Sequence, residues 1–326
     1  MATDADGGVV GVGQLLSNVN WGGRAFTHKG KGDVWVVRYD ASGEAVWMQS
    51  FGGAESDDGR AVAVNADSVY IAGVFQSPSM ALGSFTLSGS SAATPDMFLA
   101  RLDGSTGDVI WAKAFGNDGA DTAASVAVAD GGVLLAGFFQ GASLALDAST
   151  TLINTNAAAG GNSSLLALFD SDGGLVSATA YADMQSVSRM VQDPRMGAVY
   201  FVGTDYVARL GSWRASLAGS NHLDVRRSIA IDPASRYVFV AGQFNNATIS
   251  LGATTLANGN RNGGSPDAYV AQLDAETGGV EWAQRIVGSG AEMVLGLAAD
   301  SDSVYAAGER PLLCVNVMYV RGDGPG

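Results

Sequence analysis

The sequence predicts an all-β protein: a β-propeller of six blades, in which each blade is a sheet of four antiparallel strands. Two repeated strand patterns and the turn composition predict it. The 326 residues include 45 glycines but only 7 prolines, and the glycines fall mostly where strands would turn. No window of about 11 residues or more keeps a 3.6-residue apolar period without a glycine, so we expect almost no helix.

The first repeated pattern is an apolar strand, a tight polar turn and a second apolar strand that ends in glycine. Six copies occur: ATDADGGVVGVG (2–13), AVAVNADSVYIAG (61–73), SVAVADGGVLLAG (125–137), MVQDPRMGAVYFVG (190–203), SIAIDPASRYVFVAG (228–242) and LGLAADSDSVYAAG (295–308). Turns of Asp, Asn, Gly and Ser between apolar strands are typical of hairpins. We name these two strands A and B.

The second pattern is a strand, an Asp/Gly turn and a strand that often carries tryptophan, here named C and D. Five copies are complete, as in DVWVVRYDASGEAVWMQSFGG and DMFLARLDGSTGDVIWAKAFG, and a sixth begins at Val315 and stops after its first strand. A four-stranded sheet cannot bury both faces alone, whereas radial stacking of several sheets buries them and leaves only short edges. The sequence therefore predicts one propeller domain over 1–326, which could be a fragment of a longer chain.

Trp47, Trp111 and Trp282 occupy the same place in strand D. A large flat side chain there can fill the gap between twisted sheets, so we expect these tryptophans to be structural rather than ligand-stacking.

The repeated series resembles the SBBP-type β-propeller repeats of cell-surface and secreted proteins. The resemblance rests on D-x-F-x-A-R-L-D…W-A-K-x-F-G…S-V-A-V and on segments between strands B and C such as MALGSFTLSGSSAATPD (80–96) and ISLGATTLANGNRNGGSPD (249–267). It covers essentially the whole chain and implies a display or adhesion scaffold without common catalytic residues. ARLDGSTGDVIW and AQLDAETGGVEW also resemble the tryptophan-docked repeats of quinoproteins, but those enzymes have eight blades, calcium and often adjacent cysteines.

Charge and composition exclude several classes of function. The formal charge is −14, which disfavours nucleic acid as a partner. No stretch approaches about 18 apolar residues, and the first residues lack a signal-peptide pattern. The single cysteine, Cys314, cannot form an internal disulfide, and we expect a small buried hydrophobe there.

Catalytic motifs are missing from the sequence. His28 and His222 fall in different repeats without metal-ligand spacing, so we expect isolated surface imidazoles. Neither a GxSxG elbow nor a P-loop occurs. We therefore expect a protein that is not an enzyme.

Carboxylates in turns give a calcium hypothesis and an alternative to it. DADGG (4–8) and DSDGG (170–174) resemble the start of calcium loops but lack the later bidentate glutamate, which favours plain hairpin turns. Asp58 and Asp121, placed in the loops between strands D and A, could converge with carboxylates of other blades on a Ca²⁺ ion. Backbone capping by these aspartates is the favoured alternative, and no other cofactor is expected.

The segments between strands B and C are where we expect ligand contacts, because loops on a rigid scaffold commonly carry recognition. The candidate aromatic residues are Trp21, Phe26, Phe85 and Phe244. The fourth repeat has no such segment, since only Thr204 separates its strands B and C. Two glycosylation sequons, at Asn162 and Asn246, lie in these segments.

Two functions from different classes follow. The favoured one is a non-enzymatic extracellular or cell-surface scaffold that recognises protein or glycan through propeller loops and could belong to a larger assembly. The alternative is a carbohydrate-active or quinone-dependent propeller enzyme whose acidic residues converge near the axis.

Overall fold

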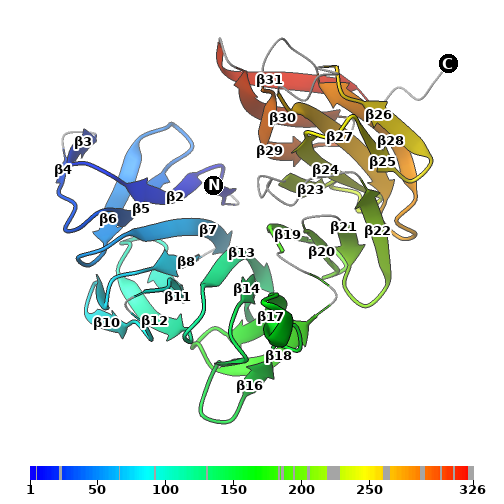
Figure 1. Ribbon diagram of the computed structural model, residues 1–326. Helices are drawn as coiled ribbons and strands as arrows, with labels where there is room; N and C mark the ends of the chain where they lie inside the picture. Colours follow the sequence, from blue (N-terminus) through cyan, green and yellow to red (C-terminus); the bar gives the residue numbers. More distant parts are fainter. Residues whose placement is uncertain are drawn as a thin grey trace. The chain divides into compact units, whose positions relative to one another are not determined.

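The chain is built almost entirely from β-strands (Figure 1). The computed structural model describes residues 1–4, 6–21, 24–65, 67–91, 93–129, 131–182, 184, 187–193, 195–203, 206–218, 228–259, 265–286, 291–301, 303–310 and 313–321. Among these residues the one helical element is a 3₁₀ turn, η1 (Ala157–Ala159). The predicted all-β class is confirmed.

The chain divides into two compact units, Met1–Ser186 and Val187–Gly326. The first unit holds three antiparallel sheets in which neighbours in sequence are neighbours in space, apart from the small hairpins between B and C. The first sheet is β1 (Ala2–Thr3), β2 (Val9–Leu15), β5 (Asp33–Tyr39) and β6 (Ala45–Phe51); the second is β7 (Asp57–Asn65), β8 (Ser68–Phe75), β11 (Asp96–Asp103) and β12 (Val109–Phe115); the third is β13 (Asp121–Ala129), β14 (Gly132–Phe139), β17 (Ser163–Asp170) and β18 (Leu175–Tyr181).

The second unit continues the same pattern. The fourth sheet is β19 (Arg189–Gln192), β20 (Val199–Val202), β21 (Tyr206–Arg209) and β22 (Trp213–Ala218); the fifth is β23 (Ser228–Ile231), β24 (Tyr237–Phe244), β27 (Asp267–Asp274) and β28 (Val280–Ile286); the sixth is β29 (Met293–Ala299), β30 (Ser303–Arg310) and β31 (Leu313–Arg321). Each predicted repeat is thus one meander, and the last has three strands, as its sequence predicts. The number of blades around an axis and the single domain stay predictions.

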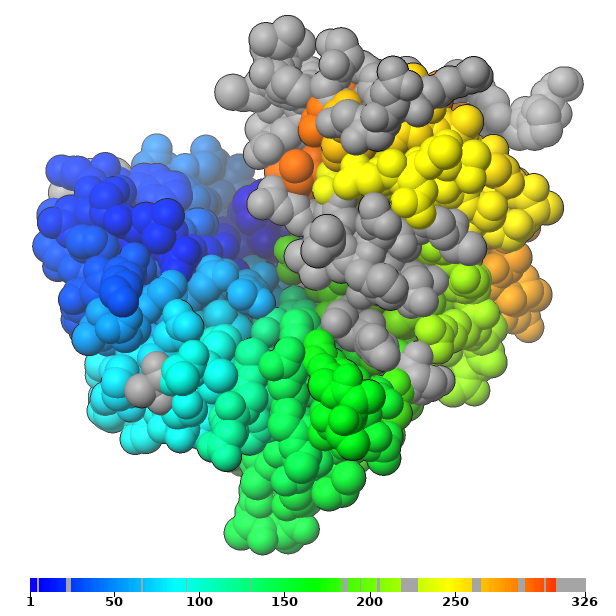
Figure 2. All heavy atoms as spheres, in the orientation of Figure 1, coloured from blue at the N-terminus to red at the C-terminus, as the bar shows by residue number. Residues whose placement is uncertain are grey.

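Small hairpins occupy the segments between strands B and C. They are β3 (Val19–Trp21) with β4 (Arg24–Phe26), β9 (Ser79–Leu82) with β10 (Phe85–Ser88), β15 (Ser143–Ala145) with β16 (Thr151–Ile153), and β25 (Thr248–Leu251) with β26 (Thr254–Ala257). The last of these hairpins also extends the fourth sheet to six strands, because β25 pairs with β22. Figure 2 shows the β15–β16 hairpin as the green lobe that projects from the first unit. In the fourth sheet β21 begins four residues after β20 ends, so this connection is short, as predicted; Thr204 lies outside the described residues.

The core lies between successive sheets. One cluster joins Trp47 and Phe51 of the first sheet to Ile71 and Phe98 of the second, and another joins the opposite face of the second sheet to the third. Every residue of β8 is buried, which requires a covered surface on both faces of this strand. Burial of both faces is the result that stacking of meanders was expected to give.

Tryptophans of strand D tie the first sheet to the second and the second sheet to the third. The indole N–H of Trp47 donates to the Gly104 carbonyl in the C–D turn of the second sheet, at 2.8 Å. Trp111 makes the same bond to Ser171 of the third sheet, also at 2.8 Å. Both rings are buried, so their structural role is confirmed.

The second unit has the same contact between its fourth and fifth sheets, whereas the tryptophan of the fifth sheet bonds differently. Trp213 of the fourth sheet donates to the Ala275 carbonyl of the fifth at 3.1 Å. Trp282 is half-buried, packs near Phe239 with ring centroids 6.3 Å apart and donates to the Gln272 side chain of its own sheet at 2.7 Å.

A glycine of left-handed conformation receives each docked ring. Gly107 has φ of +77°, and a Cβ built there would lie 2.7 Å from the Trp47 ring. Gly173 and Gly278 lie in the same way against Trp111 and Trp213, with distances of 3.1 and 2.5 Å. The turn needs glycine for its backbone conformation and again for the close approach of the indole.

We expect Trp111→Ala to lower the free energy of unfolding by about 3–5 kcal/mol, because a large buried aromatic is lost and the Ser171 carbonyl loses one of its two donors. Trp21→Ala is the control, since Trp21 is 40% exposed and its loss should change the free energy little. Denaturant unfolding measures both; an equal effect of the two substitutions would contradict the docked role of Trp111.

A pair of glycine variants separates backbone strain from ring contact. Gly43 has φ of +85° but nothing within 4 Å of a built Cβ, so Gly43→Ala should cost only the positive-φ strain, about 1–2 kcal/mol. Gly107→Ala should cost about 1–3 kcal/mol more, because its methyl group would overlap the Trp47 ring. Thermal or denaturant unfolding gives the difference, and equal losses would show that the ring does not constrain this turn.

Candidate functional site

The four aromatic residues predicted to contact a ligand differ in accessibility. Trp21 is 40% exposed, with its ring centroid 5.6 Å from that of Trp35. Phe26 and Phe85 are half-buried in their hairpins. Phe244 departs from the expectation: it is the last residue of β24, 1% exposed and in contact with the core. It belongs to strand B rather than to the B–C segment, and its side chain points inward in the strand alternation.

Asp58 and Asp121 lie in strands β7 and β13 rather than in the preceding loops. Asp58 forms an ion pair with Arg60 at 3.2 Å. Asp121 is fully buried and accepts the backbone N–H groups of Asn117 at 2.9 Å and Gln140 at 3.2 Å. These bonds hold the D–A loop against the end of strand B, so capping is confirmed for Asp121.

The metal hypothesis gains no geometric support from these positions. Asp57 repeats the capping role of Asp121 and accepts the Gly53 N–H at 2.8 Å. Within the described residues no group of three or more His, Cys, Asp or Glu side chains could hold a metal ion. Calcium binding by Asp58 and Asp121 stays a prediction.

The remaining predicted positions are placed as follows. Asp4 and Asp170 close hairpin turns by accepting the N–H groups of Gly8 and Gly174, each at 2.7 Å, which confirms the turn interpretation. Asn162 and Asn246 are half-buried, and their glycosylation stays a prediction. His28 is half-buried, while His222 and the side chain of Cys314 lie outside the described residues.

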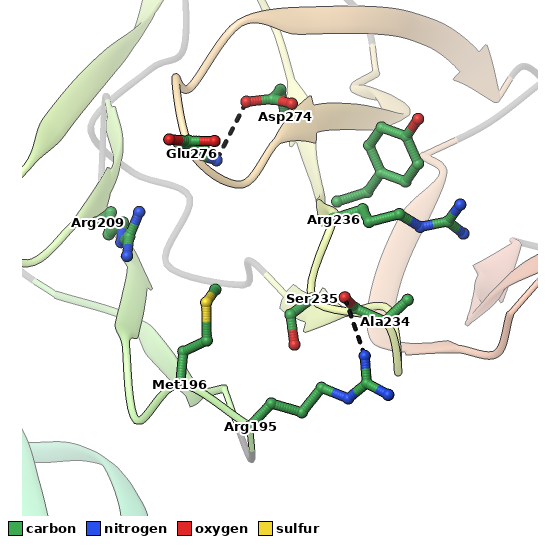
Figure 3. Close-up of a pocket in the computed structure, with 9 residues that line it drawn as sticks. Arg195, Met196, Arg209, Ala234, Ser235, Arg236, Asp274 and Glu276 are labelled. Carbon is green, nitrogen blue, oxygen red and sulfur yellow. Dashed lines mark hydrogen bonds between the residues drawn. The ribbon is translucent and has the colours of Figure 1, made fainter.

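A pocket of about 600 Å³ lies in the second unit, at the end of the strands that carries the A–B and C–D turns (Figure 3). Its walls come from the A–B and C–D turns of the fourth and fifth sheets, two neighbours in sequence. The lining residues are Arg195, Met196, Arg209, Ala234, Ser235, Arg236, Tyr237, Asp274 and Glu276. The volume falls in the range of small-molecule sites.

Asp193 stabilises the turns that form one wall of the pocket. Asp193 accepts the N–H groups of Arg195 and Met196 at 2.8 and 3.2 Å and the Ser235 hydroxyl at 2.7 Å, and so joins the A–B turns of the two sheets. Burial acts to raise the pKa of Asp193, but these hydrogen bonds and the Arg195 charge lower it overall. Asp193 therefore serves the turn as a carboxylate.

Asp274 closes the C–D turn of the fifth sheet. One of its oxygens accepts the Thr277 hydroxyl at 2.8 Å and the N–H groups of Thr277 and Glu276 at 2.7 and 3.1 Å. These bonds lower the pKa of Asp274. Its other carboxylate oxygen accepts no hydrogen bond within the described residues and is available to a ligand.

Three arginines line this pocket, and their hydrogen-bond and ion-pair partners differ (Figure 3). Arg236 pairs with Asp232 at 3.4 Å. Arg195 donates to the Ala234 carbonyl at 3.4 Å, a long bond. Arg209 makes no hydrogen bond or ion pair within the described part of the chain, and its guanidinium lies 5.8 Å from the centre of the Tyr200 ring.

The sequence analysis missed these residues, although one signal was present. The A–B turns of the fourth and fifth repeats read DPRMG and DPASRY, whereas those of the other repeats contain no basic residue. In a chain of charge −14, arginine in two successive A–B turns indicates a local concentration of positive charge.

Comparisons with known proteins show similarity in architecture. No family model and no curated protein matches the sequence. Among solved structures, the quinohemoprotein alcohol dehydrogenase of Comamonas testosteroni is 11% identical (TM-score 0.43), with 91% of this chain covered and 66% of the other. A Dos1 propeller is 12% identical (TM-score 0.43, 89% and 74% covered), and BamB of Moraxella catarrhalis is 12% identical (TM-score 0.34, 98% and 99% covered).

These structural neighbours are β-propeller proteins. The chain spans just under two thirds of the dehydrogenase, and such distant similarity carries no argument about activity. The predicted SBBP family stays a resemblance. Within the described residues, no helix has the length and apolar character needed to cross a membrane.

The buried carboxyl of Asp121 predicts a pH-dependent stability. Burial raises its pKa to about 7, with a further contribution from the Asp96 charge. Because the folded state then holds a proton that the unfolded state releases at lower pH, stability from this group is full below about pH 4 and is lost as pH rises towards 7.

We therefore expect the wild-type free energy of unfolding to fall more steeply than that of Asp121→Asn between about pH 4 and pH 7, because asparagine does not titrate there. Asp58→Asn is the matched control, since Asp58 is part-exposed and paired with Arg60. Denaturant unfolding at several pH values measures the slopes; identical slopes for wild type and Asp121→Asn would contradict the raised pKa.

Proposed function

We propose that this chain is a non-enzymatic binding module, extracellular or at the cell surface, that recognises a protein or glycan ligand. The observation that carries the proposal is the pocket formed by Arg195, Met196, Arg209 and the facing turns of the fifth sheet. Its position on turns held by a rigid sheet core is typical of recognition sites.

The chemistry of the pocket favours binding over catalysis. Asp193, Asp232 and Asp274 each accept backbone N–H groups of their own turns. These carboxylates support turn structure, whereas acid–base catalysis on a glycoside needs a carboxyl group with a raised pKa that donates a proton, and the pKa values of Asp193 and Asp274 are lowered by their hydrogen bonds. This supports a module without catalysis and without a cofactor, in preference to the alternative of a carbohydrate-active or quinone-dependent propeller enzyme.

A pocket-filling variant tests the proposal. Ala234 lines the pocket, so Ala234→Phe should abolish binding to whichever member of a glycan or peptide array the wild type retains. Ala145→Phe is the control, because Ala145 is exposed on the β15–β16 hairpin of the other unit and its substitution should leave binding unchanged. Surface-immobilised arrays followed by titration in solution give the measurement.

Two results would overturn the proposal. Binding that survives Ala234→Phe would place recognition elsewhere on the chain. Turnover of a bound glycan, detected by chromatography of the products, would establish an enzyme instead.

A further inference from the structure

Arg209 lacks a hydrogen bond that the equivalent arginines of the first unit make to the next sheet. In the sheet register, Arg38, Arg101 and Arg209 each lie opposite the tryptophan of strand D. Arg38 donates to the Gly104 carbonyl, and Arg101 donates to the Ser171 carbonyl at 2.8 Å. These are the same carbonyls that accept the docked indoles of Trp47 and Trp111.

In the fourth sheet a tyrosine replaces the arginine at this carbonyl. The Tyr200 hydroxyl and the Trp213 indole both donate to the Ala275 carbonyl, each at 3.1 Å. A carbonyl oxygen has two lone pairs, so both are used and none remains for Arg209. The guanidinium is left at the pocket wall with the Tyr200 ring as its neighbour.

We propose that this pocket binds a sugar bearing a carboxylate, such as a uronate residue of a glycan, with the guanidinium of Arg209 pairing with the carboxylate. The inference rests on the proposed binding function and names its ligand class. A guanidinium and a carboxylate match in planar, two-bond geometry.

The charge of the pocket suits a single anion. Arg236 forms an ion pair with Asp232, and Arg195 donates to the Ala234 carbonyl, whereas Arg209 has neither a hydrogen bond nor an ion pair within the described residues. A doubly charged phosphate would bring a second negative charge towards Asp274 and Glu276, and like charges at short range are unfavourable. A carboxylate supplies one charge and no more.

The acceptors around Arg209 suit hydroxyl donors. Asp274 has one carboxylate oxygen without a hydrogen bond, and the exposed Glu276 side chain has no partner within the described residues. Carboxylates accept hydrogen bonds but donate none. Sugar hydroxyl groups can supply those donors beside the carboxylate that Arg209 pairs with.

The same features favour a sugar over an acidic peptide. A peptide rich in acidic residues would approach a chain of charge −14 against long-range repulsion. Protein partners also bury broad surfaces, whereas this site is a concavity of about 600 Å³. A single uronate residue with neutral neighbours meets both constraints.

The test uses isothermal titration of the full chain with a tetrasaccharide of galactose in which one unit is galacturonic acid, and with its carboxyl-reduced counterpart, a tetramer of galactose. We expect the acidic tetramer to bind at least about tenfold more tightly than the neutral one, the difference typical of one charge-assisted hydrogen bond. Arg209→Gln should remove this preference. Lys31→Gln is the matched control: it removes one charge from a side chain 73% exposed in the other unit and should leave both affinities unchanged.

Further probes distinguish failure of this inference from failure of the binding function. Equal affinity for the two tetramers, or a preference that survives Arg209→Gln, would overturn the uronate assignment while the binding module stands. Competition by inorganic phosphate in preference to galacturonate, or binding of a poly-glutamate peptide in place of both tetramers, would overturn it in favour of another anion. Circular dichroism of Arg209→Gln confirms that the sheets are retained.

Discussion

The docking of an indole from one sheet onto the C–D turn of the next is the interaction on which the rest of the structure depends. Hydrophobic burial alone lets neighbouring sheets slide, because it has no direction. The bond from Trp47 to the Gly104 carbonyl at 2.8 Å fixes the position of one sheet on the other, and Gly107 allows the ring to reach it. Repetition of this contact by Trp111 and Trp213 keeps successive sheets in the same relation within each unit.

A shared carbonyl acceptor links this structural device to the candidate site. Each docking carbonyl takes two donors, one of which is the indole. Where the second is Arg38 or Arg101, the guanidinium is part of the junction between sheets. Where it is Tyr200, the junction is completed by a neutral group, and the positive charge of Arg209 remains on the surface. A change of one donor thus frees a guanidinium that the other junctions use for structure, which is the basis of the proposed binding role of Arg209.

The sequence was sufficient for the meanders because their determinants are local. Asp40 and Asp170 with the glycines after them form turns through contacts within four residues, and such patterns can be recognised in a single sequence. Phe244 was misplaced because the end of strand B and the start of the following segment differ by only a residue or two, and in a strand that difference decides which way a side chain points.

The pocket could not be predicted for a different reason. Arg209 and Arg101 look alike in the sequence up to this point, since each lies in an apolar strand C, after alanine and before leucine. What distinguishes them is the partner of the turn carbonyl, and Tyr200 reaches Ala275 across 75 positions of sequence. The arginines in DPRMG and DPASRY showed that charge gathers in two turns, but only the fold brings these turns beside each other.

The third sheet lacks the pairing of a strand-D tryptophan with a polar side chain of strand C. In the register of β17 and β18, Leu168 lies opposite Ser177, where the other sheets have arginine or glutamine opposite tryptophan. Neither a guanidinium nor an indole is available from these positions. Hydrophobic repetition continues through this point of the sequence, but the directional donors do not. The fifth sheet keeps the tryptophan yet pairs it differently, since the Trp282 indole donates to Gln272 of its own sheet. The apolar pattern that builds each meander is therefore independent of the donors that fix one meander against the next.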